Sequence, residues 1–345
     1  MSQQPPRLID LHTDWLLQYA PETNLYTPEM ADHALKALPQ AEGYLGATGA
    51  AILAVYRDSE DWEQRPDPWA ALGDLITRIE AEFSGRLLFG PDDLARWHDD
   101  PDGLAWGLIA IEGFDYLIRS SDDLDRLPRL FDRGVRVFQP VYSAKSLLAG
   151  SSVPGDDRGL TDLGRDFLEM LLATATSTEE PRPILDLAHL NPTSASDVLS
   201  WIEADGRRAD GLIPVYSHGA VYREGFTRPR ALTLENLKRL RALGGVVGFG
   251  VSPPFYETPE ALRRSIEETA AIPYQGRAGY EGIAIGTDFM GVDQTLPGLE
   301  NAPGVIAWVM SAFSAETARA ILRENGLRLI ERCVTIPKTG AIEAS

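Results

Sequence analysis

RLIDLHTDWL, residues 7–16, joins a short apolar run to a histidine and an aspartate two positions apart, His12 and Asp14. Side chains alternate between the two faces of a β-strand, so a strand here would point both groups the same way. Burying an imidazole beside a carboxylate is unfavourable unless a partner compensates for the lost hydration, and a metal ion is such a partner. The stretch therefore predicts a buried strand that ends in two candidate metal ligands.

The same pattern, a short apolar run followed by turn or polar residues, recurs along the chain. The expected strands cover residues 7–14, 46–56, 104–114, 134–143, 183–190, 212–219, 244–251 and 282–289. Their nearly continuous apolar character is typical of strands buried on both faces in a parallel sheet. Helical patterns, several opened by a Thr, Ser or Asp cap, lie between them at residues 27–38, 67–83, 161–175, 193–204, 233–243, 258–271 and 314–333.

Eight strands alternating with helices in 345 residues predict an α/β fold of the (β/α)8 or TIM-barrel type. A doubly wound open sheet is the competing arrangement. No internal repeat, low-complexity tract or long linker divides the chain, so we expect a single domain over residues 1–345.

Polar residues at the ends of six expected strands favour the barrel. They are His12, Asp14, Glu112, Tyr142, His189, His218 and Asp288. In a barrel all strand ends meet at one face, where active sites are built, whereas in an open sheet they are spread along an edge.

Each polar residue also has a purely structural interpretation. A single histidine in an apolar strand is commonly a hydrogen-bonded core residue, but three of the five histidines stand at strand ends. Glu112 could cap a helix or pair with an arginine, although a carboxylate inside LIAIEGF needs a cation. Asp186 is expected to support the site rather than bind a metal, and Asp288 could be a helix cap, a supporting group or a proton carrier. We expect His33, in a helical stretch, and His98, in the acidic loop RWHDDPD, at the surface.

The candidate ligands themselves indicate the metal. They are His12, Asp14, Glu112, His189 and His218. Histidine and carboxylate ligands without thiolates suit Zn²⁺, with Mn²⁺, Co²⁺ and Fe²⁺ as alternatives. Five ligands exceed the need of one open tetrahedral site and suffice for two ions if one carboxylate bridges them. Two such ions can hold a hydroxide and polarise a carbonyl or phosphoryl oxygen.

Composition limits the partners. The chain is 44% hydrophobic, which is normal for a globular protein, and its formal net charge of −19 disfavours nucleic acid and anionic membranes. A single cysteine, Cys333, excludes an internal disulfide and fits a reducing compartment. Without an apolar run for a signal peptide or a membrane span, we expect a cytoplasmic protein that acts on a small molecule. A homodimer formed through helices is compatible with the sequence.

With these residues identified, the chain resembles the membrane (renal) dipeptidase family of zinc peptidases, which belong to the metal-dependent hydrolase barrels. The resemblance covers nearly the whole chain and rests on nine motifs in the family's order. They are DLHTD, IEGF, GVRVFQPVY, GLTDLG, DLAH, YSHGAVYREGFTRPRAL, LTLENLKRLRALGGVVG, IGTDFMG and ENGLRLIERC.

The resemblance implies a role for each candidate residue. One zinc ion would be bound by His12, Asp14 and Glu112, and a second by Glu112, His189 and His218. Asp288 would carry the proton. An arginine after the second histidine of the second zinc site, His218, would bind the substrate carboxylate. Arg230 fits this place best, and Arg228 competes with it.

Two positions depart from the family's pattern. Tyr142 stands where the family has a histidine that stabilises the oxyanion, and a phenol can donate a hydrogen bond but cannot become a cation. Met290 replaces the second aspartate of Asp-Phe-Asp-Gly. The leading interpretation is a binuclear zinc dipeptidase that uses a metal-bridging hydroxide. The alternatives are a related hydrolase of another small amide, lactam or ester, and a non-catalytic barrel that keeps its metals.

Overall fold

The computed structural model describes residues 5–142, 146–176, 181–223 and 230–335. Eight parallel strands close into a barrel in sequence order, and β1 also pairs with β8. Their bounds are β1 (Leu8–Thr13), β2 (Thr48–Val55), β3 (Trp106–Glu112), β4 (Val135–Gln139), β5 (Ile184–Asp186), β6 (Ile213–Tyr216), β7 (Val246–Phe249) and β8 (Ile283–Ile285). The TIM-barrel prediction is confirmed, and the open sheet is excluded.

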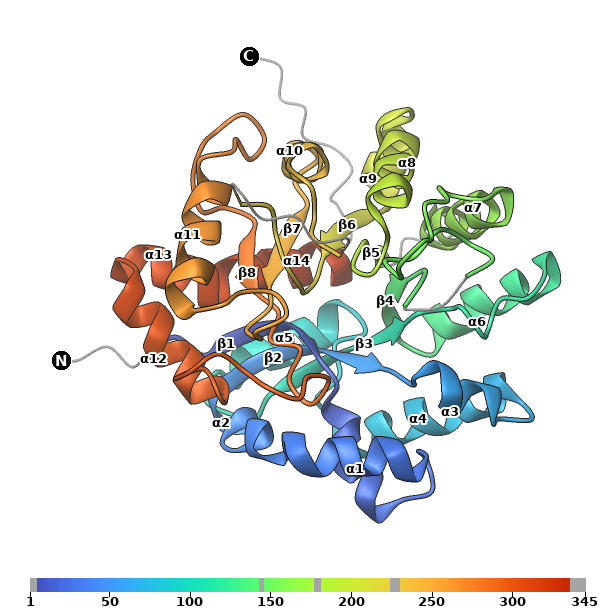
Figure 1. The fold of residues 1–345 in the computed structure, drawn as a ribbon, viewed down its shortest axis with the longest axis horizontal. Coiled ribbons are helices and arrows are strands. Elements are labelled where there is room, and N and C mark those ends of the chain that lie inside the picture. Colours follow the sequence, from blue (N-terminus) through green and yellow to red (C-terminus); the bar gives the residue numbers. More distant parts are fainter. Residues whose placement is uncertain (1–4, 143–145, 177–180, 224–229, 336–345) are drawn as a thin grey trace.

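Helices surround the barrel, and in Figure 1 the chain runs from blue α1 at the bottom, past green α7 on the right, to red α12 on the left. Helices at the expected places are α1 (Pro28–Ala37), α4 (Pro68–Glu82), α7 (Asp162–Thr176), α8 (Pro192–Glu203), α10 (Leu234–Ala242) and α11 (Pro259–Ala270). The last expected helix consists of α13 (Ala315–Arg319), a π-helical turn (Ala320–Glu324) and α14 (Asn325–Val334).

Several further helices are not among those predicted from the sequence. They are α2 (Tyr44–Ala47), α3 (Ser59–Glu63), α5 (Pro91–Asp99), α6 (Leu127–Asp132), α9 (Gly206–Gly211), α12 (Ala302–Ala312) and 3₁₀ helices at Trp15–Glu22, Leu38–Ala41 and Ser121–Arg126. Helix α5 corrects one expectation, because His98 lies in its last turn rather than in a loop. The helix begins with Pro91 in its first turn, and the carboxylate of Asp93 accepts a hydrogen bond from the backbone amide of Gly90. The His98 side chain is exposed, as expected.

Two hydrophobic clusters follow from strand alternation. In β3, Ile109 and Ile111 face the surrounding helices, while Leu108 and Ala110 face the barrel interior. Glu112, the next residue in the inward series, therefore points into the barrel. The interior cluster continues into α5 and α14, whose Trp97 and Leu329 belong to it. One end of the barrel is thus filled with apolar side chains, which leaves the carboxyl ends of the strands for the polar residues.

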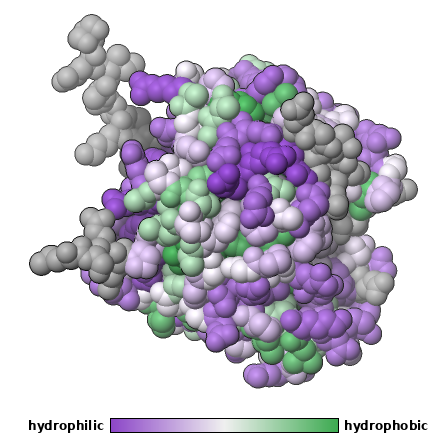
Figure 2. All heavy atoms as spheres, turned by 60° about the vertical axis from the view of Figure 1, so that its left-hand side comes forward, coloured by the Kyte–Doolittle hydropathy of each residue, from purple (hydrophilic) through white to green (hydrophobic). Residues whose placement is uncertain are grey.

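No helix among the described residues is both long enough and apolar enough to cross a membrane. On the face shown in Figure 2, hydrophobic residues are interspersed among hydrophilic ones. The described surface exposes a few large apolar side chains, of which Leu104 is 52% and Met310 37% exposed. Isolated apolar residues of this kind are normal on a globular surface.

Candidate functional site

His12, Asp14 and Glu112 meet at the carboxyl ends of β1 and β3. His12 is the fifth residue of β1 and Asp14 directly follows that strand, while Glu112 is the last residue of β3. The Nε2 atom of His12 lies 3.7 Å from Oδ2 of Asp14 and 3.5 Å from Oε2 of Glu112. The predicted common direction of His12 and Asp14 is therefore confirmed. His12, Asp14 and Glu112 form a first group of candidate ligands that could hold a metal ion.

The second carboxylate oxygen of Glu112 faces two other histidines. Its Oε1 atom lies 3.1 Å from Nε2 of His189 and 3.7 Å from Nε2 of His218. The two Nε2 atoms are 3.1 Å apart. A hydrogen bond of 2.8 Å between Ser217 Oγ and Nδ1 of His218 fixes the ring so that Nε2 points into the site. Glu112, His189 and His218 thus form a second group of candidate ligands that could also hold a metal ion. Glu112 belongs to both groups.

Two buried atoms of the first group have no hydrogen-bond partner within the described part of the chain. They are Nε2 of His12 and Oδ1 of Asp14. Such atoms lose their hydration on burial, and coordination to a cation compensates for that loss. The nitrogen and oxygen donors, without thiolates, suit Zn²⁺ or another divalent first-row metal. The residues present therefore fit a divalent metal centre.

Arg230 supplies positive charge to the second group. Its Nη2 atom lies 2.5 Å from Nε2 of His189 and 2.8 Å from Nε2 of His218. A guanidinium only donates hydrogen bonds, so both histidine nitrogens present lone pairs to it. These are the lone pairs that a metal ion would use. The Arg230 guanidinium also lies over the ring of Phe255, with 5.1 Å between Cζ and the ring centroid.

The protonation of the cluster follows from burial and neighbouring charge. Burial opposes a charge on His12, but Glu112 and Asp14 outweigh it and hold the pKa of His12 well above its ordinary value. Burial, with Arg230 beside it, lowers the pKa of His189 to about 4. Burial and the neighbouring cations also lower the pKa of His218. The carboxylates thus favour a positive charge at His12, which a bound cation would supply in place of the proton. The two histidines near Arg230 stay neutral, as metal ligands must be.

Asp288 lies beside the first group, with Oδ1 3.9 Å from Nε2 of His12. Burial raises its pKa to about 6. Its backbone has a φ of 60°, and that of His189 has a φ of 65°. Left-handed backbone at residues other than glycine costs about 1–3 kcal/mol and concentrates at functional sites. Two candidate site residues are thus held in strained conformations.

Tyr142 lies three residues beyond the end of β4, and its ring centroid is 4.4 Å from that of His189. Its backbone amide donates to Oδ2 of Asp115 at 2.7 Å. Burial and the charge of Glu112 raise the pKa of Tyr142 above its ordinary value, so the side chain is a neutral phenol. Tyr142 therefore carries a hydrogen-bond donor close to the second group.

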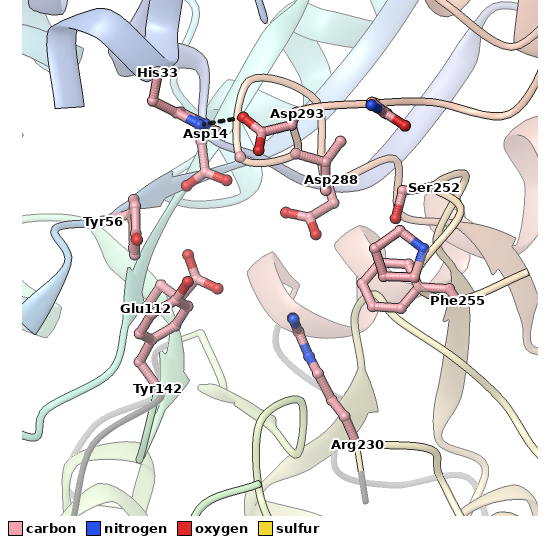
Figure 3. A pocket seen from close by; sticks show the side chains of 14 residues that line it. Asp14, His33, Tyr56, Glu112, Tyr142, Arg230, Ser252, Phe255, Asp288 and Asp293 are labelled. Carbon is pink, nitrogen blue, oxygen red and sulfur yellow. Dashed lines mark hydrogen bonds and ion pairs between the residues drawn. The ribbon is translucent and has the colours of Figure 1, made fainter. Parts of the chain in front are cut away.

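Several of these side chains, but not the three histidines His12, His189 and His218, line one cavity of about 380 Å³. Its lining residues are Asp14, His33, Tyr56, Glu112, Tyr142, Arg230, Ser252, Pro254, Phe255, Asp288, Gly291, Val292, Asp293 and Gln294. Figure 3 shows Arg230 pointing into the cavity toward Glu112 and Asp288, with Ser252 and Phe255 on one side and Tyr56 and Tyr142 on the other. The structure thus brings together every predicted site residue that it describes. Arg228 lies outside the described residues.

The expectation that His33 lies at the surface is confirmed only in part, because the side chain is partly exposed but also makes contacts at the cavity. Its Nδ1 atom is 2.9 Å from Oδ1 of Asp293, and its Nε2 atom is 3.0 Å from the carbonyl oxygen of Met290. The side chain is 28% exposed and faces the cavity. Helical periodicity places His33 on α1 but carries no information about the β8–α12 loop that folds over this helix.

Met290 does not face the cavity. Its side chain is fully buried in the hydrophobic cluster around the barrel, and its backbone has a φ of 70°. Its amide donates to Oε1 of Gln40 at 2.6 Å. The substitution at this position therefore adds an apolar contact rather than changing the cavity wall.

Two lining residues follow strands to which the sequence assigns no site residue. Tyr56 comes directly after β2, and Ser252 comes three residues after β7. The Oγ atom of Ser252 is buried and has no hydrogen-bond partner among the described residues. The rule that polar residues at the ends of barrel strands converge would have found both.

Curated proteins that are similar in sequence to this chain are named dipeptidases. The chain is 24% identical over 271 residues to an uncharacterized dipeptidase of Schizosaccharomyces pombe, which covers 74% of this chain and 60% of that protein. It is 26% identical over 267 residues to dipeptidase verJ of Clonostachys rogersoniana, covering 75% and 63%. The chain thus spans about three fifths of the length of these curated relatives.

Solved structures share the fold. Dipeptidase AC, a metallopeptidase of family M19, superposes with a TM-score of 0.69 at 21% identity, over 96% of this chain and 99% of that one. A metallopeptidase from Rhodobacter sphaeroides, liganded with a phosphinate mimic of the dipeptide L-Ala-D-Ala, gives 0.68 at 19% identity, over 96% and 100%. The model of the family described as membrane dipeptidase (peptidase family M19) matches residues 3–340. Because that match takes in almost the entire chain, this protein belongs to the membrane dipeptidase family.

Proposed function

We propose that the chain is a binuclear zinc dipeptidase that hydrolyses the amide bond of dipeptides or dipeptide-like small molecules. The observation that carries the proposal is the position of Glu112, whose Oε2 faces His12 while Oε1 faces His189. A carboxylate placed in this way can serve two cations at once. One ion would be held by His12, Asp14 and Glu112, and the other by Glu112, His189 and His218.

Two such ions, when bound, supply a hydroxide nucleophile at neutral pH and polarise the scissile carbonyl. The chain's own residues then handle protons and charge. Asp288 takes the proton of the nucleophile and gives it to the leaving amine, and a pKa of about 6 suits a group that must do both near neutral pH. Tyr142 donates a hydrogen bond to the oxygen that becomes negative.

With the lone pairs of His189 and His218 taken up by a metal ion, Arg230 would turn from these nitrogens and bind the free carboxylate of the substrate. It enters the cavity opposite Asp14 and Asp288, so the cavity has a cationic side and an acidic side (Figure 3). A molecule with separated charges, such as a dipeptide, matches this arrangement. Further support comes from curated relatives named dipeptidases and from the dipeptide mimic bound to the Rhodobacter protein.

Tyr142 favours a second candidate function, the hydrolysis of another small amide, lactam or ester. A neutral phenol stabilises a developing negative charge less than an imidazolium does, so substrates with better leaving groups than a peptide amine would suit it.

The test is turnover by the metal-free protein and by the same protein reloaded with zinc. The substrates are L,L- and L,D-dipeptides, N-acyl amino acids, lactams and esters. We expect hydrolysis of dipeptides that chelation abolishes and zinc restores. His12→Ala should remove most of the restored activity, and His98→Ala, a histidine exposed on α5, is the matched control. Dipeptide turnover that survives chelation would contradict the metal centre, and zinc-dependent turnover of lactams or esters alone would favour the second function.

A further inference from the structure

Asp10 is a buried carboxylate close to the candidate metal ligands but outside the two groups of three in which Glu112 takes part. Its Oδ1 atom accepts hydrogen bonds from the amide of His12, at 3.2 Å, and from the amide of Thr287, at 2.8 Å. Its Oδ2 atom accepts from the hydroxyls of Thr287, at 2.6 Å, and of Tyr44, at 2.7 Å. Asp10 therefore joins the end of β1 to the segment that follows β8.

Asp186 makes the same connection on another side of the barrel. It is 1% exposed, and its Oδ1 atom accepts from the amides of Ala188 and Ser217, both at 3.0 Å. The first amide belongs to its own chain segment, two residues on, as the amide of His12 does for Asp10. Asp186 therefore joins the end of β5 to the end of β6.

The two connections also share their register. Asp10 pairs with Ile285 of β8 and binds the amide two residues beyond it, that of Thr287. Asp186 pairs with Val215 of β6 and binds the amide two residues beyond it. In each case a side-chain oxygen accepts a hydrogen bond from an amide just beyond the end of the neighbouring strand, so that amide keeps a partner where the regular ladder is interrupted. Beyond Asp10 the backbone pairing resumes, with bonds from the amide of Asp288 to His12 and from the amide of Asp14 to Phe289.

Each carboxylate also holds an amide next to a strained residue. Thr287 directly precedes Asp288, with a φ of 60°, and Ala188 directly precedes His189, with a φ of 65°. A left-handed residue other than glycine persists only where its surroundings fix it. The two aspartates supply fixed hydrogen bonds at these places.

We propose that Asp10 and Asp186 are positioning residues, each fixing the backbone of one half of the metal centre. Asp10 fixes the half that contains His12, and Asp186 fixes the half that contains His189 and His218. The inference rests on the proposed metal centre. Asp186 also lies with His12 and His218 in a third group of side chains that could hold a metal ion, whereas Asp10 belongs to no such group among the described residues. The proposal gives both aspartates a role through the backbone, which differs from metal ligation and from supplying charge.

The conservative substitution separates these roles. Asparagine keeps an Oδ1 atom that can accept both amides, whereas alanine removes the acceptor. Asp10→Ala and Asp186→Ala should each weaken zinc binding at one half of the site by about 10- to 100-fold, the usual effect of losing a group that orients metal ligands. The corresponding asparagine variants should restore most of the affinity. Tyr44→Phe, which removes one bond to Asp10 but neither amide, is the matched control.

The two halves can be measured separately by competition of the protein with a chromophoric chelator for Zn²⁺. In a His218→Ala background, where the half containing His12 remains, Asp10→Ala should weaken binding and Asp186→Ala should not. In a His12→Ala background the order should reverse. Equal effects in both backgrounds, or asparagine variants as weak as the alanine variants, would overturn the assignment.

A second measurement does not depend on the folding of the alanine variants. The amides of Thr287 and Ser217 should exchange slowly with solvent deuterium in the wild-type protein, and fast exchange of either would overturn the role of its aspartate. A protein that binds two zinc ions with the predicted pattern but hydrolyses no dipeptide would contradict the proposed function alone. A wild-type protein that binds no zinc would contradict both proposals.

Discussion

Glu112 connects the two halves of the candidate centre because strand alternation sends it into the barrel at the last residue of β3. Its neighbours determine its charge. Burial would raise its pKa, but His12 and His189 outweigh burial and hold the pKa of Glu112 well below its ordinary value. The group is therefore an anion in the folded protein, which is the form that coordinates metals.

Asp288→Asn tests proton transfer. The asparagine side chain is close in size, but it cannot accept the proton. We expect unchanged metal content and a fall in dipeptide turnover of about 10²- to 10⁴-fold, the usual contribution of a positioned acid–base group. Elemental analysis and kcat give the two readouts. Unchanged turnover would leave Asp288 with a structural role only.

Tyr142 is tested by two substitutions. If the phenol donates to the oxyanion, Tyr142→Phe should lower kcat by about 10²- to 10³-fold with little change in KM, because the bond forms in the transition state. If the ring only fills space, Tyr142→Phe will be nearly silent and Tyr142→His should raise dipeptide turnover. Rates that change in neither variant would place Tyr142 outside the reaction.

At the scale of elements, the sequence predicts where strands occur better than where they end. Every observed strand lies inside its expected range, yet the pattern extends one strand to residue 143 while β4 ends at Gln139. Buried loop residues beyond a short strand have the same apolar character as the strand, so composition does not mark the end of pairing. The left-handed backbone of His189 and Asp288 has no sequence signal either, because it depends on contacts with neighbouring strands.

Gly291 tests how closely the β8–α12 loop fits the site. A Cβ atom at this position would lie 2.1 Å from Oδ2 of Asp14 and 2.8 Å from Oδ1 of Asp288. Gly291→Ala should therefore displace Asp14 and weaken metal binding at least about tenfold. Gly46→Ala, where a Cβ would meet nothing within 4 Å, is the control. Equal metal affinity in the two variants would show that the loop leaves room beside Asp14.

The carboxyl of Asp115, which binds the backbone amide of Tyr142, should make the free energy of unfolding depend on pH. Burial raises the pKa of Asp115 from 3.8 to about 7. Between these values the folded protein holds a proton that the unfolded chain has lost, so this group makes the free energy of unfolding fall as pH rises. Asparagine does not titrate and keeps an oxygen for the Tyr142 amide.

Asp115→Asn should therefore become more stable relative to the wild type as pH rises from about 4 to about 8, by at most about 1.4 kcal/mol for each unit of the pKa difference. Denaturant unfolding at pH 5 and pH 8 measures the change. Asp122→Asn, which alters a surface carboxylate, is the control. A stability difference that is constant over this range would mean that Asp115 is ionised throughout.

At the scale of the whole molecule, closure of the barrel makes the site. Residues from β1 and β3, and from the segments after β5, β6 and β8, converge because all eight strands are parallel and their carboxyl ends share one face. This convergence is predictable from the sequence, since it needs only strand order and strand polarity. The approach of His33 and Asp293 is not, because it depends on how a loop folds across α1.

The metal content of the purified protein tests the bridging position of Glu112 most directly. After expression in metal-replete medium, elemental analysis should give close to two divalent ions per chain. Glu112→Gln should lose at least one, because a neutral amide does not bridge two cations as a carboxylate does. Glu203→Gln, on the outer side of α8, is the matched control and should keep both. One ion per folded wild-type chain, or two ions retained in Glu112→Gln, would contradict the binuclear centre.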